Sequence, residues 1–243
     1  MRSIAVYSLK GGVGKTTLAV NLALAAAGSA RRTLLWDLDP QGAATWLLGA
    51  PTQRGREAQA VFSKDVDPHK LIRPTPFERL DLLPADASLR GLDRFFFGLG
   101  KKKRLLNLIE NAGENYDRVL LDAPPGLTEV SEQVLRAADL VIVPLIPSPL
   151  SRRALDEVSA FLARNTPKRP PILPVFNMVD RRRTMHREAI DAEANWPIVP
   201  MASALESMTA RPGEFGRPPP SSPAGEAVAR LWRGIEKRLA RSG

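Results

Sequence analysis

Residues 10–17 read Lys-Gly-Gly-Val-Gly-Lys-Thr-Thr, and this octapeptide decides the fold of the chain. An apolar run, Ile4-Ala5-Val6-Tyr7, precedes it, and an alanine- and leucine-rich stretch, residues 18–27, follows it. The pattern predicts a strand, a glycine-rich turn and a helix, in that order. The backbone N–H groups of such a turn and the positive end of the helix dipole point at one place, which makes the segment a cradle for phosphate.

The octapeptide also indicates which groups would hold the phosphates. Glycine at positions 11, 12 and 14 allows positive φ and lets the backbone approach phosphate oxygens without a Cβ in the way. Lys15 is expected to reach the β- and γ-phosphates, and the Thr16 hydroxyl is expected to ligate Mg²⁺. Leu9 stands where a strict P-loop has glycine, and a second lysine, Lys10, begins the loop. The predicted nucleotide-binding residues of the loop are Gly11, Gly12, Val13, Gly14, Lys15, Thr16 and Thr17.

This loop, with its second lysine, resembles the deviant Walker A motif of the ParA/MinD family of P-loop ATPases. Residues 34–42, Leu-Leu-Trp-Asp-Leu-Asp-Pro-Gln-Gly, resemble the switch I of the family. Residues 118–126, Arg-Val-Leu-Leu-Asp-Ala-Pro-Pro-Gly, resemble its Walker B strand and switch II. Three motifs in the right order are far more specific than one. The resemblance implies ATP and Mg²⁺ as cofactors and a slow, Mg²⁺-dependent ATPase, closest to the small ParA-type partitioning proteins.

The carboxylates of these motifs have separate expected roles. Asp122 ends an apolar strand, where a carboxylate is costly unless it serves a cation, and it is expected to hold Mg²⁺ through water. Asp37 and Asp39 lie two residues apart in an extended segment and so point to the same face. By resemblance, Asp39 positions and activates the attacking water, which leaves Asp37 to support Mg²⁺ or to order the loop. The alternative is that Asp39 merely begins an Asp-Pro turn.

Lys10 carries the sharpest implication of the resemblance. In the family this lysine reaches the nucleotide bound by the partner subunit, so that two chains sandwich two ATP molecules. The resemblance therefore implies a homodimer in the ATP state, which hydrolysis would dissolve. It also makes Lys10, Lys15 and Asp39 the expected catalytic residues. The alternative for Lys10 is a solvated loop lysine with no contact across a subunit boundary.

Base recognition is assigned by resemblance. Asn177 ends a predicted strand and matches the family position whose side chain contacts adenine. Pro200 and Met201 match the stretch that walls the base. An asparagine after a buried strand is also a common turn residue, which is the alternative here.

Apolar runs and helical stretches alternate along the chain, which is typical of a parallel sheet with crossover helices. The sequence thus predicts an α/β fold of the P-loop NTPase type: a doubly wound, mainly parallel sheet with helices on both faces, in a single domain over residues 1–243. Residues 51–79 and 211–223 are rich in proline and are expected to be loops, the first with one short helix. The expected strands are residues 3–7, 33–36, 80–83, 118–122, 140–145, 172–177 and 198–199. The expected helices are residues 16–27, 43–48, 102–111, 131–137, 151–164, 185–194, 204–210 and 224–241.

An excess of positive charge is the second global signal. The 35 lysines and arginines outnumber 26 acidic residues, which gives a formal net charge of +9 and a pI near 10.3. Basic surfaces of this size are typical of chains that meet nucleic acid or anionic lipid, although a GC-rich genome also raises arginine content. The chain has no cysteine, which excludes disulfides and thiolate metal sites. Together with an ATP-type site, these features predict a cytoplasmic, nucleoid-associated protein.

Three basic clusters are candidates for binding the DNA backbone. The cluster at residues 181–187 follows a predicted strand and matches a family segment that includes a DNA-contacting arginine. The other two stand at predicted helix starts, where cations oppose the helix dipole and so fit a phosphate-binding role better than a structural one. Such contacts would depend on salt and not on base sequence. The predicted DNA-binding residues are Arg181, Arg182, Arg183, Arg187, Lys102, Lys103, Arg152 and Arg153.

The last predicted helix allows two interpretations. Its apolar residues recur at helical spacing, with basic residues around them. The favoured interpretation is that the apolar stripe packs against the sheet, whose face must be covered. The alternative is that the helix lies on anionic lipid, as in MinD-type members of the family.

These observations lead to one expected function and one alternative. We expect an ATP-dependent dimerising ATPase that segregates DNA or positions a cellular cargo, whose ATP-bound dimer binds nonspecific DNA. A ParB-like or cargo-adaptor protein would stimulate its hydrolysis. The alternative is a MinD-like, membrane-associated regulator of cell division or polar structures. A biosynthetic or metal-cluster ATPase of the same superfamily is disfavoured because no cysteine is present to carry a cluster.

Overall fold

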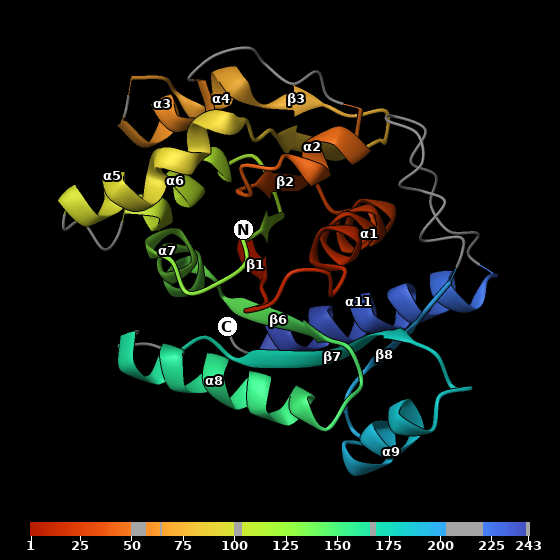
Figure 1. The fold of residues 1–243 in the computed structure, drawn as a ribbon. Coiled ribbons are helices and arrows are strands. Elements are labelled where there is room, and N and C mark those ends of the chain that lie inside the picture. Colours follow the sequence, from red (N-terminus) through yellow and green to blue (C-terminus); the bar gives the residue numbers. More distant parts are fainter. Residues whose placement is uncertain (50–56, 64, 100–103, 166–168, 203–220, 242–243) are drawn as a thin grey trace.

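The computed structural model describes residues 1–49, 57–63, 65–99, 104–165, 169–202 and 221–241 (Figure 1). These residues form an eight-stranded sheet in the order β3-β4-β2-β5-β1-β6-β7-β8. Neighbouring strands are parallel except β3 and β4, which confirms the predicted doubly wound, mainly parallel sheet. The strands are β1 (Arg2–Val6), β2 (Thr33–Asp37), β3 (Arg73–Pro74), β4 (Leu80–Leu83), β5 (Arg118–Asp122), β6 (Leu140–Leu145), β7 (Ile172–Val179) and β8 (Ile198–Pro200).

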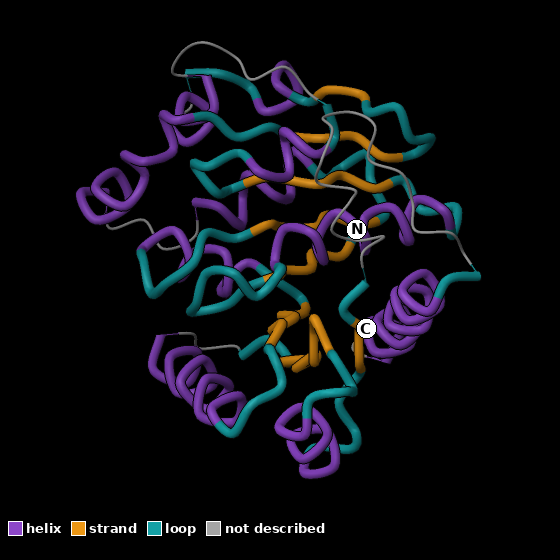
Figure 2. Tube along the Cα trace, turned by 45° about the vertical axis from the view of Figure 1, so that its right-hand side comes forward, coloured by secondary structure: helices purple, strands orange, loops and turns teal. Residues whose placement is uncertain are grey.

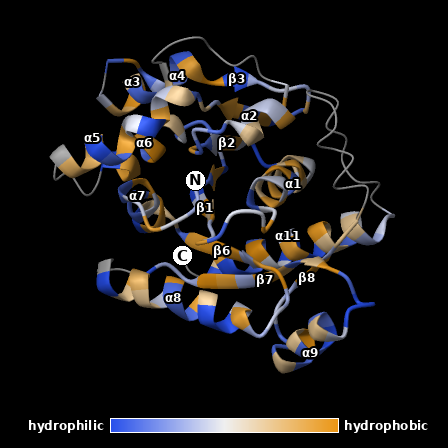
Figure 3. Ribbon diagram, viewed as in Figure 1, coloured by the Kyte–Doolittle hydropathy of each residue, from blue (hydrophilic) through white to orange (hydrophobic). Residues whose placement is uncertain are grey.

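The strands that surround the nucleotide motifs are buried on both faces of the sheet. Every residue of β2 and of β6 is buried, which explains why these runs show no alternation of apolar and polar residues. In Figure 3, β6 and β7 carry the colours of hydrophobic residues. β7 continues to Val179, beyond its predicted end at residue 177.

Helices cover both faces of the sheet (Figure 2). One apolar cluster joins one face to α1, α2 and α11, and a second cluster joins the other face to the helices from α3 to α9. The core therefore consists of two layers separated by the sheet. The helices are α1 (Lys15–Gly28), α2 (Ala43–Leu47), α3 (Glu57–Ser63), α4 (Pro68–Leu71), α5 (Leu92–Leu99), α6 (Arg104–Ala112), α7 (Glu129–Ala137), α8 (Leu150–Asn165), α9 (Thr184–Ala192) and α11 (Pro223–Arg241), with a 3₁₀ turn η1 at Ala87–Gly91.

The segment from residue 57 to residue 79 is more regular than the sequence predicts. It holds α3, α4 and β3 instead of one short helix in a loop. Pro68 suggests a loop in the sequence but begins α4, where a missing N–H costs nothing, and the Asp67 side chain accepts a hydrogen bond from the His69 amide at 3.0 Å. Neither η1 nor α5 is predicted. The predicted helix 204–210 and most of the predicted loop 211–223 lie outside the described residues.

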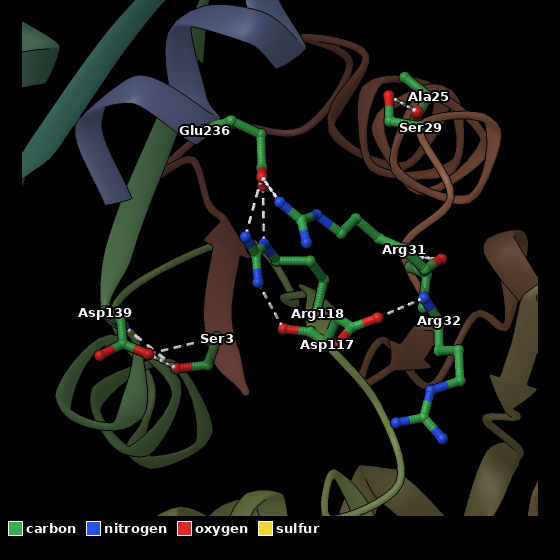
Figure 4. A network of polar contacts seen from close by, with 10 residues as sticks. Ser3, Ala25, Ser29, Arg31, Arg32, Asp117, Arg118, Asp139 and Glu236 are labelled. Carbon is green, nitrogen blue, oxygen red and sulfur yellow. Dashed lines mark hydrogen bonds and ion pairs between the residues drawn. The ribbon is translucent and has the colours of Figure 1, made fainter. Parts of the chain in front are cut away.

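The C-terminal helix α11 packs its apolar stripe against the sheet, as the favoured interpretation expects. Val228, Leu231, Trp232, Ile235 and Leu239 are all buried. Figure 4 shows how the polar side of the helix is fastened: Glu236 accepts two hydrogen bonds from Arg118, at 2.7 and 2.9 Å, and one from Arg31 at 3.1 Å. Among the described helices, none combines the length and the hydropathy that crossing a membrane requires.

Candidate functional site

The phosphate loop connects β1 to α1 at the carboxyl end of the central strands. Gly12 (φ 76°) and Gly14 (φ 77°) adopt the left-handed conformation that favours glycine, whereas Gly11 does not. Gly14 immediately precedes α1, and Lys15, the first residue of the helix, is only 8% exposed. The predicted loop is therefore present, and two of its three glycines are required by the backbone conformation.

Asn177, near the carboxyl end of β7, contacts the phosphate loop directly. Its Nδ2 donates a hydrogen bond to the carbonyl of Val13 at 2.8 Å. A Cβ at Gly14 would lie 2.6 Å from this Nδ2, so any larger residue there would force the Asn177 side chain to move away from the loop. The side chain predicted to contact adenine thus also holds the loop predicted to bind phosphate.

A pocket beside the loop brings together the residues predicted to surround the base. Asn177, Pro200 and Met201 line it, together with Gly14 and Thr17 of the phosphate loop. Its remaining lining is mostly apolar, from α1, β8 and α11. Apolar walls with a few polar groups are typical of ligand pockets, and a planar base would suit this one.

Two buried carboxylates lie side by side next to the phosphate loop. Asp37 of β2 and Asp122 of β5 are register partners on neighbouring strands, and both are fully buried. Neither carboxylate oxygen of Asp122 has a hydrogen-bond partner in the described part of the chain. Burial, and then the charge of Asp37, raise the pKa of Asp122, while the nearby Thr16 hydroxyl and Lys15 ammonium act in the opposite direction. An orphaned buried carboxylate beside a hydroxyl is a donor set that fits a hard cation such as Mg²⁺.

Asp37 differs from Asp122 because its oxygens are occupied. One accepts hydrogen bonds from the amide and the hydroxyl of Thr45, at 2.9 and 2.8 Å. The other accepts from the amide of Asp39 at 3.2 Å. Burial raises the pKa of Asp37, and the bonds from Thr45 and Asp39 oppose this rise. Asp37 therefore orders the loop after β2, which is one of its two expected roles.

Asp39 itself is half-buried, and its contacts bear on one of the two interpretations made from the sequence, the Asp-Pro turn. Its Oδ1 accepts a hydrogen bond from the Gln41 amide at 2.9 Å, so the side chain does shape the Asp-Pro turn. The turn nevertheless follows β2 at the carboxyl edge of the sheet. In the strand order only β5 lies between β2 and β1, the strand that leads into the phosphate loop. The position agrees with a role toward the nucleotide.

Lys10 lies exposed at the start of the phosphate loop, and in the described residues its side chain has no hydrogen bond or ion pair. Large apolar side chains are exposed in the segments that follow the two strands flanking β1. They are Leu127 after β5, and Ile146 and Leu150 after β6, with 54%, 36% and 56% exposure. The free lysine thus stands on an edge of the sheet that also presents apolar surface.

The arginine cluster at residues 181–187 is partly engaged within the chain. Arg182 forms a two-point ion pair with Asp180, at 2.9 and 3.0 Å. The Arg187 guanidinium donates to the carbonyls of Arg181 and Arg182, at 2.9 and 3.0 Å. Arg181 and Arg183 are exposed, and their side chains have no ion pair to any described residue. Two of the four arginines of this cluster therefore hold the loop in shape, and two are exposed with no ion pair to a described residue.

The other predicted DNA-binding residues are either paired with acidic residues or not described by the structure. Arg152 pairs with Glu193 at 2.9 Å, and Arg153 pairs with Glu157 at 3.2 Å, so their charge is offset within the chain. Lys102 and Lys103 lie outside the described residues. Exposed basic residues also follow one side of α11, at Arg233, Lys237 and Arg241. The candidate polyanion surface thus comprises the arginine loop and the outer side of α11 rather than the start of α8.

Replacing Asp122 with asparagine is expected to stabilise the Mg²⁺-free protein. Folding raises the pKa of Asp122, so the protonated carboxyl is tolerated in the folded protein and the ionised carboxylate is not. The free energy of unfolding therefore benefits fully from this group only below its ordinary pKa of about 4, and this benefit is lost as pH rises through the raised pKa. Asp122→Asn removes this loss, so its free energy of unfolding in EDTA should exceed that of the wild type by about 1–2 kcal/mol at pH 8 and by less at pH 6. Urea unfolding at the two pH values measures the difference, with Asp139→Asn at a partly exposed site as control. A variant less stable than the wild type at pH 8 would contradict the burial argument.

Several known proteins are similar to this chain. A family model described as an AAA domain matches residues 1–168. The sporulation initiation inhibitor protein Soj of Bacillus subtilis is 37% identical over 146 residues, which are 58% of this chain and 57% of that protein. The chromosome-partitioning ATPase Soj of Thermus thermophilus is 32% identical over 260 residues, which cover 98% of this chain and 97% of that protein. The crystal structure of cobyrinic acid a,c-diamide synthase from Mycobacterium smegmatis, with bound ADP and magnesium, has a TM-score of 0.79 and 26% identity, and covers 99% of this chain and 96% of that one.

Proposed function

Because the chain belongs to the ParA/MinD family of P-loop ATPases, we propose that it is a Mg²⁺-dependent ATPase that segregates DNA or positions a cellular cargo. The observation that carries the proposal is the second lysine of the phosphate loop, Lys10, exposed on an edge of the sheet that also presents exposed apolar side chains. The similarity to a chromosome-partitioning ATPase along nearly the whole chain supports it.

The chemistry of such a site is mostly positioning and neutralisation of charge. Lys15 and the amides of the phosphate loop bind the phosphates, and Asp39 orients the attacking water. Thr16 and, through water, Asp122 would hold Mg²⁺, which neutralises charge on the phosphates when bound. The described residues of the site include no arginine that would reach the γ-phosphate, so the intrinsic rate is slow. A ParB-like or cargo-adaptor partner stimulates it.

ATP acts as a dimerisation switch in this proposal. Lys10 reaches the nucleotide of the partner subunit, and Leu127, Ile146 and Leu150 lose their exposure at the interface. The interface has two-fold symmetry, since each chain offers the same edge to the other. It persists only while the γ-phosphate is present, so hydrolysis returns the chain to a monomer.

The dimer binds nonspecific DNA because it presents two basic surfaces at once. The second contact is then intramolecular, and avidity rises without any new interaction. ATP should therefore raise the affinity for duplex DNA steeply, and added salt should erase the gain through counterion release. Surface-binding measurements with ADP and with a non-hydrolysed ATP analogue, each at two salt concentrations, test this. Equal affinity with both nucleotides would contradict ATP control of DNA binding.

The arginine loop and the start of α8 offer a matched pair of variants for the same assay. Replacing Arg181 and Arg183 with alanine should reduce the slope of log affinity against log salt by about 0.9 for each DNA phosphate that is no longer neutralised. Replacing Arg152 and Arg153 removes the same formal charge, but these residues are already paired, so the slope should stay near that of the wild type. Equal slopes for the two double variants would place DNA away from the arginine loop.

Replacing Asp39 with alanine is expected to stop hydrolysis while nucleotide binding is kept. The variant loses the group that orients the water, which lowers kcat by about 100-fold or more, but it retains the phosphate loop. It should accumulate as the ATP-bound dimer, seen by light scattering after chromatography. Phosphate release measures kcat, with Asp86→Ala, whose side chain caps η1 and contacts the Ala58 amide, as a control for disturbed loop packing. Wild-type hydrolysis by the Asp39 variant would exclude the water-positioning role.

A MinD-like role at a membrane has weaker support. It needs a helix whose apolar side is available to lipid, and the apolar stripe of α11 is buried against the sheet. Flotation with anionic vesicles, compared with DNA binding under the same nucleotide, separates the two functions. Binding to vesicles and not to DNA in the ATP state would favour the membrane-associated regulator.

A further inference from the structure

We infer that Thr45, in α2, is a positioning residue for ATP hydrolysis: it holds Asp37 so that Asp37 in turn holds the backbone of Asp39. This inference rests on the proposed ATPase function and adds to it a residue that no motif of the sequence identifies. Thr45 is itself fully buried, and its hydroxyl lies between two partners.

The direction of the hydrogen bonds at Thr45 follows from the chemistry of the partners. The Ala85 amide can only donate, and it lies 2.9 Å from Thr45 Oγ1, which therefore accepts there. The single hydroxyl proton of Thr45 is then left for Asp37 Oδ2, 2.8 Å away. The backbone after β4 thus sets the orientation of a side chain in α2, the helix that follows β2.

Asp37 passes this constraint on to the residue expected to orient the water. All three of its hydrogen bonds come from the segment that follows it: two from Thr45 and one from the Asp39 amide. The Asp37 carboxylate therefore connects the two ends of the segment from Asp39 to Thr45. A further hydrogen bond, from the Gly42 amide to the Asp39 carbonyl at 2.8 Å, tightens the same turn. If fewer donors held Asp37, the Asp39 carboxylate would still be present, but its backbone would no longer be fixed in the same position.

The hydroxyl of Thr45 is needed for this, not merely its volume. Valine has nearly the same shape, but Thr45→Val would leave one Asp37 oxygen with a single donor and the Ala85 amide without a partner. Serine would restore both bonds. The phosphate loop and the base pocket do not contact Thr45 in any hydrogen bond between described residues, so nucleotide affinity has no reason to change.

Thr75 provides a matched control for the loss of a bridging hydroxyl. Its Oγ1 accepts from the Phe77 amide at 3.2 Å and donates to the Leu80 carbonyl at 2.6 Å, at the β3–β4 turn. Thr75→Val therefore removes the same kind of bridge as Thr45→Val. It does so in a turn that, within the described part of the chain, has no hydrogen bond to Asp37 or Asp39.

The experiment measures ATP hydrolysis, ADP affinity and melting temperature for the wild type, Thr45→Val, Thr45→Ser and Thr75→Val. We expect kcat to fall about tenfold or more in Thr45→Val, with KM for ATP and ADP affinity within about twofold of the wild type. Thr45→Ser should restore kcat, and Thr75→Val should lose melting temperature without losing kcat. Unchanged kcat in Thr45→Val, or an equal loss of kcat in Thr75→Val, would overturn the inference. Absence of hydrolysis by the wild type would instead contradict the proposed function.

Discussion

Replacing Lys15 with alanine is expected to lower ATP affinity by about 100-fold or more. Lys15 is buried at the first turn of α1, so its ammonium sits in a site of low dielectric, where its attraction for phosphate is strong. No other lysine is buried in the described residues, and none of them can take its place. Titration calorimetry with ATP and Mg²⁺ measures the loss. Affinity within about threefold of the wild type would show that the loop amides alone hold the phosphates.

Lys10→Ala is the companion to that variant, because removing either lysine of the loop should cause a different defect. Removal of Lys10 should leave ATP binding by the monomer unchanged and abolish the ATP-dependent dimer, since in the proposed dimer this lysine reaches the nucleotide of the partner subunit. DNA affinity should then stay at the level seen with ADP. Sedimentation with a non-hydrolysed ATP analogue measures the dimer, and Lys70→Ala, at an exposed lysine of α4, is the control. A Lys10 variant that dimerises normally would mark Lys10 as a solvated loop residue.

The fold could be predicted from the sequence wherever local pattern and burial agree. β2, β5 and β6 are continuous apolar runs because both of their faces are covered, and β1 leads into a loop whose glycines have a recognisable purpose. β3 could not be found in this way. It has two residues, ends on a proline and is held by one antiparallel pairing with β4, so it carries almost no periodic signal.

The polar residues at the ends of the buried strands could be predicted for the candidate site, but the residue that supports them from α2 could not. Asp37, Asp122 and Asn177 stand out in sequence because polar groups at the ends of buried strands are unusual. Thr45 carries no such mark, because its partners are Asp37 and the distant Ala85 amide, and only the fold brings them together. The sequence also does not show which charged residues are paired. Arg152 counts as a free cation until the structure places Glu193, which directly follows α9, within 2.9 Å of it.

The contact between Asn177 and the phosphate loop has a consequence for how this chain can change over time. A Cβ added at Gly14 would lie 2.6 Å from the side-chain amide of Asn177, which would have to shift, and the positive φ of Gly14 disfavours other residues as well. A substitution at position 14 alone is therefore disfavoured twice, by the contact and by the backbone conformation, whereas a shorter side chain at position 177 removes the first of these two obstacles. The two positions, far apart in the sequence, are therefore coupled in packing: the side chain at the end of β7 decides how much room is left at the turn just before α1.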